Sequence, residues 1–480
     1  MNFPAPFSWI NGTAERSHVD DGAWLHDPNS AAALAPTRSS STEQIDRAVD
    51  AAADAHAGGR WSALGAEGRA PFLRALADGL DSRADEIAGL DAINSGVPIS
   101  VTRLFASSNG DTVRTAVDRA LAVGDAEGVP ADGRDVRIHR VPWGPTALLM
   151  PWNAPSAMAV KKLGFALAAG ATAVMKPSPA SPWSTLLIAE AAAEAGIPEG
   201  VVNLVLGGAK VGARLVEDRR IAAISMTGST PTGRAIAATA GPRFARLRLE
   251  LGSNNPAIVL PDADVVATAR ALVGGAMKLS GQWCEAPRRI IAARAVRDRL
   301  VEALRAELAT VTIGSSLDDR TTFGPVAFEG RRRELTAQRE ALAASGATIL
   351  ETGPVPEEGW FFAPTLAVGE AVELDSEIFG PLLTVEAFDA VEDGVRRANS
   401  GQVGLAGYVF SDDVGAATAL GTRLVAGEVK INGTSLLDMS PHSEQSFFGS
   451  SGLGGHGDAE LLEFFVGKRI VGADAPGLPL

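Results

Sequence analysis

Hydrophobic and polar positions along the chain follow a helical period first and a strand-like pattern later. The segment Ser41-Thr42-Glu43-Gln44 is typical of a helix start, and the alanine-rich stretch behind it ends near Gly58-Gly59. Between Arg69 and Leu90, apolar side chains recur at the spacing of one helix face. The chain before residue 110 is therefore predicted to be mainly helical.

From residue 146 onward, short apolar runs alternate with helical stretches that glycine or proline closes. Because such strands are joined by right-handed helical crossovers, the alternation predicts a mostly parallel sheet. The fold class is therefore α/β, with the doubly wound architecture typical of nucleotide-binding domains. The expected strands are 146–150, 173–175, 201–206 and 221–226, and the expected helices are 157–169, 184–195 and one from Pro231.

A second α/β series begins after Asn254-Asn255-Pro256. Its expected strands are 257–260 and 289–293, and its expected helices are 263–279 and 296–310. We therefore place a domain boundary near residue 253.

Composition narrows the class of protein. The 480 residues include 46% hydrophobic and 21% charged residues, as in a soluble globular protein of two or three domains. The net charge of 43 − 57 = −14 argues against nucleic acid or an anionic membrane as the main partner, since both need a basic surface. No apolar run is long enough to span a membrane, and the first residues do not resemble a signal peptide.

Cys284 is the single cysteine, which excludes a disulfide within the chain and favours the cytoplasm as compartment. On cysteine statistics alone it would be a small buried hydrophobe. The polar segment 280–285 around it does not fit the middle of a helix or strand, however, and nucleophiles are often presented on such irregular turns. Glu250 offers a carboxylate that can act as base toward the thiol or a water. The six histidines have no metal-ligand spacing, so no metal site is expected.

Two segments have the composition of a nucleotide-binding site. Met226 to Gly233 follows an expected strand and opens an expected helix, so its backbone amides and the helix dipole can receive a diphosphate. An ordinary strand–helix turn is the alternative, because neither the three-glycine dinucleotide pattern nor a P-loop lysine is present. Lys176-Pro177-Ser178 ends another expected strand, where it can bind ribose hydroxyls or can simply be solvated.

With these segments, the chain resembles the aldehyde dehydrogenase superfamily from about Asp50 to its end. The resemblance implies a Rossmann-like cofactor domain (1–120 and 145–253), an α/β catalytic domain (254–440), and a small β oligomerisation element with a C-terminal return (121–144 and 441–480). The motifs that carry it are Pro151-Trp152-Asn153, Lys176-Pro177-Ser178, Thr227-Gly228-Ser229, Leu249-Glu250-Leu251-Gly252, Gly281-Gln282-Trp283-Cys284 and Glu377-Ile378-Phe379-Gly380-Pro381.

The resemblance also implies catalytic roles. Cys284 would attack an aldehyde to form a thiohemiacetal, whose oxyanion the Asn153 amide and the Cys284 backbone N–H would hold. After hydride transfer to NAD or NADP, Glu250 would activate the water that hydrolyses the thioester. Lys162 would tune this base. The cofactor-binding residues implied are Trp152, Lys176, Ser178, Pro179, Gly228, Ser229, Gly233, Leu251, Glu377 and Phe379.

Simpler interpretations exist for some of these residues: Asn153 as a turn residue, Glu377 as a solvated carboxylate and Phe379 as core. One departure concerns Pro179, which stands where relatives that prefer NAD often carry a glutamate facing the adenosine ribose. Without that carboxylate, a repulsive element against NADP is missing, so use of both cofactors is expected.

Three alternative functions can be compared by the residues that each would need. A CoA-acylating relative would form the same thioester but generally lacks the base, so Glu250 argues against it. A non-catalytic homologue acting as a binding or structural protein would tolerate loss of Cys284 or Glu250, yet both are present. A cysteine hydrolase would need a histidine partner, and no motif suggests one. The resemblance implies a small-molecule aldehyde as substrate and further copies of the chain as partners, in a homodimer or homotetramer built through 135–140 and 464–471.

Overall fold

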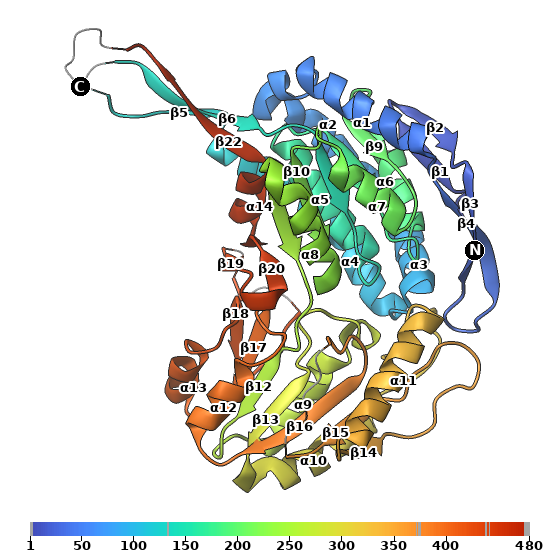
Figure 1. The fold of residues 1–480 in the computed structure, drawn as a ribbon, viewed down its shortest axis with the longest axis vertical. Coiled ribbons are helices and arrows are strands. Elements are labelled where there is room, and N and C mark those ends of the chain that lie inside the picture. Colours follow the sequence, from blue (N-terminus) through green and yellow to red (C-terminus); the bar gives the residue numbers. More distant parts are fainter. Residues whose placement is uncertain are drawn as a thin grey trace.

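The computed structural model describes residues 3–131, 134–370, 372, 376–436, 439–440 and 442–474. Two large sheets, each with helices on both faces, form the upper and lower parts of the molecule in Figure 1, and a narrow β arm projects from the upper part. The predicted fold class, α/β with a doubly wound cofactor-type domain and a second α/β domain, is confirmed. The exact domain boundaries stay a prediction.

The first sheet has eight strands in the order β2-β1-β9-β8-β7-β10-β11-β20. Its inner strands are parallel, and β1 and β20 join antiparallel near the edges. The strands are β1 (Phe7–Ile10), β2 (Thr13–Arg16), β7 (Thr146–Leu149), β8 (Ala173–Lys176), β9 (Val202–Leu204), β10 (Ala223–Thr227), β11 (Arg246–Glu250) and β20 (Gly452–Leu453).

Side chains of these strands alternate between two hydrophobic cores, as the two-residue period requires. Leu148 and Met175 pack on one side, while Ala147, Leu149 and Val174 pack on the other. The helices of this half are α1 (Thr42–Ala57), α2 (Gly65–Asp81), α3 (Ala84–Ser95), α4 (Ile99–Val123), α5 (Pro155–Ala168), α6 (Trp183–Glu194), α7 (Ala209–Glu217) and α8 (Thr230–Ala240).

The strand order reverses at β7, because the chain runs from β7 through β8 to β9 and then returns to β10 on the other side of β7. In an open α/β sheet, the carboxyl ends of the strands at such a reversal form the ligand crevice. Strand β11, which was not predicted from the sequence, brings Glu250 to the same edge.

The helical spacing predicted between Arg69 and Leu90 is confirmed, and it is divided between two helices, α2 and α3, which are separated at Ser82 and Arg83. Apolar periodicity continues across the break, since both helices pack on one core, and this is why the sequence pattern hides it. The predicted start at Ser41 is confirmed, with a capping box between Ser41 and Gln44.

The second sheet has the order β14-β15-β16-β13-β12-β17-β18 and is parallel except at β14. Its strands are β12 (Pro256–Val259), β13 (Arg289–Ala293), β14 (Thr348–Glu351), β15 (Thr365–Val368), β16 (Leu382–Phe388), β17 (Ala406–Phe410) and β18 (Glu428–Ile431). The helices of this half are α9 (Val265–Ala276), α10 (Arg294–Leu308), α11 (Glu329–Ala344), α12 (Val391–Ala398) and α13 (Val414–Gly421).

The helix predicted to reach Leu279 ends at Ala276. Leu279 and Ser280 adopt positive φ angles of 52° and 55°, which α-helical geometry excludes. The chain therefore leaves the helix and enters an irregular turn before Cys284, as expected for that segment.

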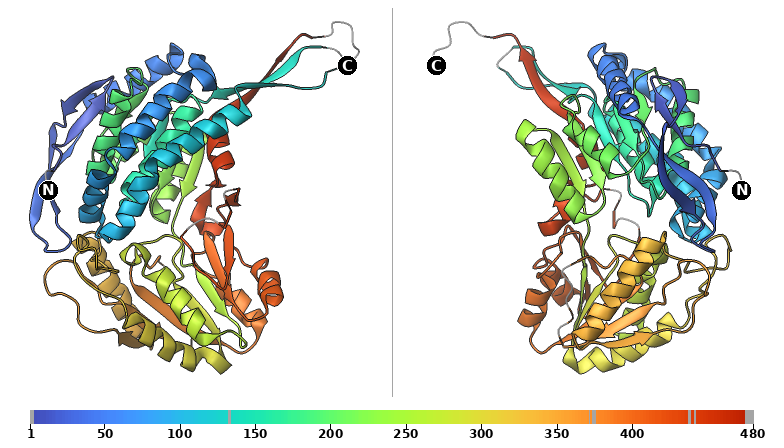
Figure 2. Two further views of the ribbon diagram at one scale, coloured as in Figure 1. Left: turned by 180° about the vertical axis from the view of Figure 1, so that it is seen from behind. Right: turned by 45° about the vertical axis from the view of Figure 1, so that its right-hand side comes forward.

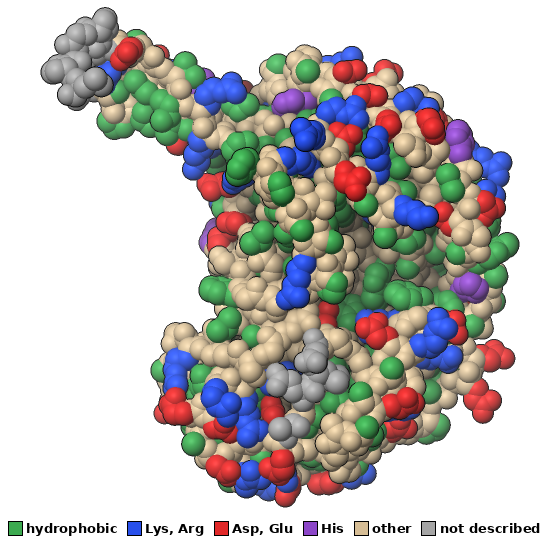
Figure 3. Space-filling model, viewed as in Figure 1, with side chains coloured by type: hydrophobic (Ala, Val, Ile, Leu, Met, Phe, Trp, Pro, Cys, Tyr) green, Lys and Arg blue, Asp and Glu red, His purple; other side chains and the backbone are tan. Residues whose placement is uncertain are grey.

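The arm consists of β5 (Ala126–Gly128), β6 (Val136–Pro142) and β22 (Val466–Gly472), which form an antiparallel three-stranded sheet. It extends away from the body in both views of Figure 2, and hydrophobic side chains gather on its visible face in Figure 3. The remaining elements are β3 (Val19–His26), β4 (Ala33–Ser39), β19 (Gln445–Ser446), β21 (Gly455–His456), α14 (Asp458–Phe464) and short 3-10 turns at Ser62–Leu64, Gly241–Arg243, Lys278–Gly281 and Gly449–Ser451.

One detail of the predicted arm is wrong. Phe464 ends α14 rather than lying on a strand, and Phe465 is buried in the core of its own chain. The exposed apolar residues of the arm are Ile470 and Val471, with 71% and 52% of their surface accessible.

Candidate functional site

A cavity of about 780 Å³ lies between the carboxyl edge of the first sheet and the loops that lead into β13 and β16 of the second sheet. The structure brings most of the residues predicted from sequence together on its wall. They are Trp152, Asn153, Lys176, Ser178, Pro179, Gly228, Ser229, Glu250, Leu251, Cys284, Glu377 and Phe379.

Two predicted residues lie just behind this wall. Gly233, on α8, packs so closely on Leu251 that a Cβ atom there would lie 2.4 Å from its side chain, so it brings helix and strand together. Lys162 is buried on α5, and its Nζ donates to Ser225 Oγ at 2.9 Å.

The amino end of α8 faces the cavity. Gly228, Ser229, Pro231 and Thr232 all line it, and Ser229 caps the helix by accepting from the Thr232 N–H. A helix amino terminus with free amides and a positive dipole end binds anions. The segment therefore has the geometry that a diphosphate needs.

Lys176 also lines the cavity, at the end of β8. Its buried Nζ donates to the carbonyl oxygens of Pro177 and Gly207 at 2.8 and 2.9 Å. Burial lowers the pKa of Lys176 to about 8, so a ligand that hydrogen-bonds it meets a partly desolvated ammonium group.

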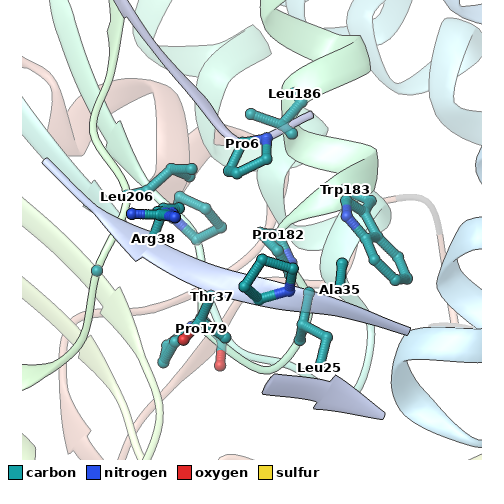
Figure 4. Close-up of a pocket in the computed structure, with 14 residues that line it drawn as sticks. Pro6, Leu25, Ala35, Thr37, Arg38, Pro179, Pro182, Trp183, Leu186 and Leu206 are labelled. Atoms are coloured by element: carbon teal, nitrogen blue, oxygen red, sulfur yellow. The ribbon is translucent and has the colours of Figure 1, made fainter. Parts of the chain in front are cut away.

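A small pocket lies behind Ser178 and Pro179, which line both it and the large cavity (Figure 4). Arg38 of β4 lines this pocket and forms an ion pair with the exposed Asp20 at 3.3 Å. The sequence analysis missed Arg38, because no local pattern connects β4 to the end of β8.

The turn that carries Cys284 is fixed from three directions. The Asn255 amide donates to the carbonyl oxygens of Cys284 and Ala286 at 2.8 and 2.9 Å. Buried Arg288 donates to the carbonyl oxygens of Gly281 and Gly380. A Cβ atom on Gly281 would lie 2.5 Å from the Pro381 nitrogen, so this position requires glycine for close approach as well as for its φ of 73°.

The Cys284 thiol is surrounded by groups that oppose its ionisation. Burial raises its pKa well above the ordinary value, and the carboxylates of Glu250, Glu285 and Glu377 raise it further. At neutral pH the group is therefore a thiol, and a proton acceptor is needed before it can attack.

The Asn153 side chain reaches the same turn. Its amide donates one N–H to the Gln282 carbonyl oxygen at 2.8 Å, and an asparagine amide has a second N–H. Gln282 is itself fixed, since its side chain donates to the Ser95 carbonyl and accepts from the Ala327 N–H.

Glu250 is buried at the end of β11 and strongly hydrogen-bonded. Its Oε1 lies 3.1 Å from His456 Nε2, and its Oε2 accepts from Thr227 Oγ1 at 3.1 Å. Burial alone would raise the pKa of this carboxyl, but His456, Arg248 and Lys162 outweigh burial and hold it well below its usual range.

A family model described as the aldehyde dehydrogenase family matches residues 17–471. The chain belongs to this family.

Relatives within the family act on different aldehydes. Geranial dehydrogenase of Castellaniella defragrans is 33% identical over 82% of this chain and 83% of its own. Betaine aldehyde dehydrogenase of Rhizobium etli is 30% identical over 95% of this chain and 96% of its own. Among solved structures, a mutant of aldehyde dehydrogenase C from Pseudomonas syringae, in complex with NAD+ and octanal, is 30% identical, covers 99% of this chain and 98% of its own, and has a TM-score of 0.90.

The two motif residues near the far end of the cavity belong to the loop before β16. Glu377 accepts from the Ser253 N–H at 3.2 Å, and burial raises its pKa to about 7 although Arg288 and Arg331 oppose this. Phe379 packs edge-on against Trp152, with ring centroids 5.3 Å apart. Arg331 of α11 also lines the cavity and was not found from sequence.

Among the residues that the structure describes, no group of three or more His, Cys, Asp or Glu side chains is arranged to hold a metal ion. Within the same residues, no helix combines the length and apolar character that crossing a membrane requires.

Proposed function

We propose that this aldehyde dehydrogenase family member oxidises an aldehyde to the carboxylic acid with NAD or NADP, through a covalent intermediate on Cys284. One observation carries the proposal: Cys284 and Glu250 line the same cavity as the anion-binding end of α8. A nucleophile, a base and a site for a diphosphate are thereby in one enclosure.

The residues present fit a dinucleotide. The cavity of about 780 Å³ has the size of a cofactor site, with Lys176 and Ser178 at one end and Glu377 and Phe379 among the residues of its wall. The α8 end would hold the diphosphate, Lys176 and Ser178 the adenosine ribose, and Glu377 the nicotinamide ribose. When bound, the dinucleotide supplies the hydride acceptor.

In the first half-reaction the Cys284 thiol loses its proton, through Glu250 or a water, and its sulfur bonds to the aldehyde carbon. The carbonyl oxygen becomes an oxyanion, and the second Asn153 N–H and the Cys284 backbone N–H are its donors. The oxyanion then re-forms a C=O bond as hydride leaves the same carbon, which gives a thioester on Cys284.

In the second half-reaction Glu250 takes a proton from water as that water attacks the thioester. The C–S bond breaks, the carboxylic acid leaves and Cys284 is regenerated. The presence of this base supports hydrolysis over transfer to a thiol such as CoA. A cytoplasmic location, expected from the single cysteine, stays a prediction.

The first prediction concerns Cys284→Ser. We expect dehydrogenase activity to fall by several orders of magnitude while cofactor binding and the melting temperature are kept, because a hydroxyl is a much poorer nucleophile. Steady-state assays with a panel of aldehydes, together with cofactor titration, measure this. Since Cys284 is the single cysteine, the alkylated fraction of the wild type should equal the lost activity; full alkylation without loss would refute the mechanism.

The second prediction separates Glu250 from Cys284 in time. Glu250→Gln should still give a fast first turnover of reduced cofactor and then stall, with an acyl-enzyme detectable by intact mass. Stopped-flow absorbance and rapid-quench mass spectrometry test this, and Glu340→Gln, on an exposed residue of α11, is the matched control. Wild-type steady-state turnover in Glu250→Gln would show that Glu250 is not the base.

The third prediction is cofactor choice. Pro179→Glu should depress use of NADP more than use of NAD, by about ten- to a hundredfold in the ratio of kcat/KM, since a carboxylate there would repel a 2′-phosphate by about 1–3 kcal/mol. Pro179→Gln is the matched neutral control. Arg38→Ala should also weaken use of NADP. Arg38 lines the small pocket together with Ser178 and Pro179, so the positive charge of its guanidinium would attract a 2′-phosphate bound beside them. A wild type that ignores NADP, or an unchanged ratio, would contradict this reading of the site.

The fourth prediction is assembly into a dimer or tetramer of C2-based symmetry. The arm presents Ile470 and Val471 to solvent, and soluble proteins rarely leave such an apolar strand uncovered. Light scattering of the wild type should give a molar mass that is a multiple of 49.5 kDa, and Ile470→Asp should lower this molar mass. Leu317→Asp, at an exposed loop residue outside the arm, is the control. A wild-type monomer at working concentration would overturn the prediction.

A further inference from the structure

The carboxylate of Glu250 is held by a cluster that the mechanism above does not use. Arg248 lies two residues earlier on β11, so its side chain is on the same face as that of Glu250. His456 comes from β21, near the C-terminus. Its Nε2 lies 3.1 Å from Glu250 Oε1, and its Nδ1 lies 3.2 Å from Arg248 Nη2.

These two contacts fix the tautomer of His456. A guanidinium has only donors, so Arg248 must donate and His456 Nδ1 must accept. The imidazole proton is then on Nε2, from which it donates to Glu250.

The side chains of the cluster are closely packed. The Phe447 ring lies 5.4 Å from the Arg248 guanidinium and packs edge-on against His456 at 5.1 Å. Arg248 is almost fully buried, and its Nε donates to the Gly455 carbonyl oxygen at 2.9 Å. Gly454, with a φ of 87°, lets β21 approach, since a Cβ atom there would lie 3.2 Å from Arg248.

The charges around Glu250 come from several elements. Arg248 on its own strand, with Nη1 3.9 Å away, Lys162 on α5 and His456 favour the carboxylate, while the Cys284 thiol faces it from the loop before β13. Beyond these, Glu460 of α14 acts on Arg248, and Glu285 lies near His456. The positive charges of Arg248 and Lys162 and the hydrogen bond from His456 thus keep Glu250 ionised and aligned.

We propose that His456, held in its Nε2–H form by Arg248, is a positioning residue that orients the Glu250 carboxylate for hydrolysis of the acyl-enzyme. The proposal rests on the proposed function. His456 does not touch the reacting atoms; it acts through Oε1 of Glu250, while Oε2 accepts from Thr227 Oγ1.

His456→Leu removes the donor without adding a charge, and His456→Gln keeps an N–H donor that can reach Glu250. We expect His456→Leu to give a normal first burst of reduced cofactor but about tenfold or more slower release of the acyl group, with His456→Gln between it and the wild type. His18→Leu, at an exposed histidine, is the matched control. Rapid-quench mass spectrometry of the acyl-enzyme measures the release directly.

The pH profile of acyl release gives a readout that a merely structural role would not move. In the wild type, Glu250 is ionised throughout the neutral range because its pKa is depressed. Hydrolysis is therefore lost only as the pH falls through that pKa. Loss of the His456 donor raises this pKa, so the acid limb of His456→Leu should move to higher pH. His456→Gln should move it less.

An unchanged release rate and acid limb in folded His456→Leu would overturn the proposal. Equal loss of burst and release in both variants, with lower melting temperatures, would overturn it too, since that marks a structural role. The controls separate this failure from failure of the proposed function: if wild-type enzyme oxidises aldehydes and Glu250→Gln stalls as an acyl-enzyme, only the role of His456 is refuted.

Discussion

Three acidic groups share one buried cavity, and the site depends on how their ionisation is controlled. The Cys284 thiol and the carboxylates of Glu250 and Glu377 line the same space, where each negative charge opposes the others. Glu250 is surrounded by Arg248, Lys162 and His456 and stays ionised, whereas burial raises the pKa of Glu377 to about 7. Because His456, Arg248 and Lys162 outweigh burial at Glu250, whereas Arg288 and Arg331 do not outweigh it at Glu377, the acids have different proton affinities, and an ionised carboxylate and a protonated thiol can coexist.

The two sheets make this arrangement possible. Loops at the carboxyl ends of β8, β7, β10 and β11 carry Lys176, Asn153, the α8 end and Glu250, and the reversal of strand order puts them side by side. The second sheet contributes the loops that enter β13 and β16, with Cys284 and Glu377. Close contacts connect the halves: a Cβ atom on Gly252 would lie 2.0 Å from the Glu377 carboxylate, so any larger residue there would displace this side chain.

Sequence predicted the parts of this site that local patterns encode. Cys284, Glu250 and the loop before α8 stand in short motifs, and the structure places all three on one cavity. Arg248 and His456 were not predicted as partners, since they are distant in sequence and only the antiparallel pairing of β20 with β11 brings the C-terminal segment beside Glu250. Phe465 was misassigned for a related reason: an apolar residue near a chain end fits an exposed strand as well as the core that it enters.

The C-terminal segment therefore has two functions in the architecture. Residues 452–456 add β20 to the first sheet and set His456 against Glu250, and after α14 the chain continues directly into β22 of the arm. Phe465, between α14 and β22, is buried in the core around α4 and α5, which anchors the segment at its middle. Because one anchored stretch connects the surroundings of Glu250 to the arm, the position of the Glu250 carboxylate depends on how the end of the chain folds back on the body.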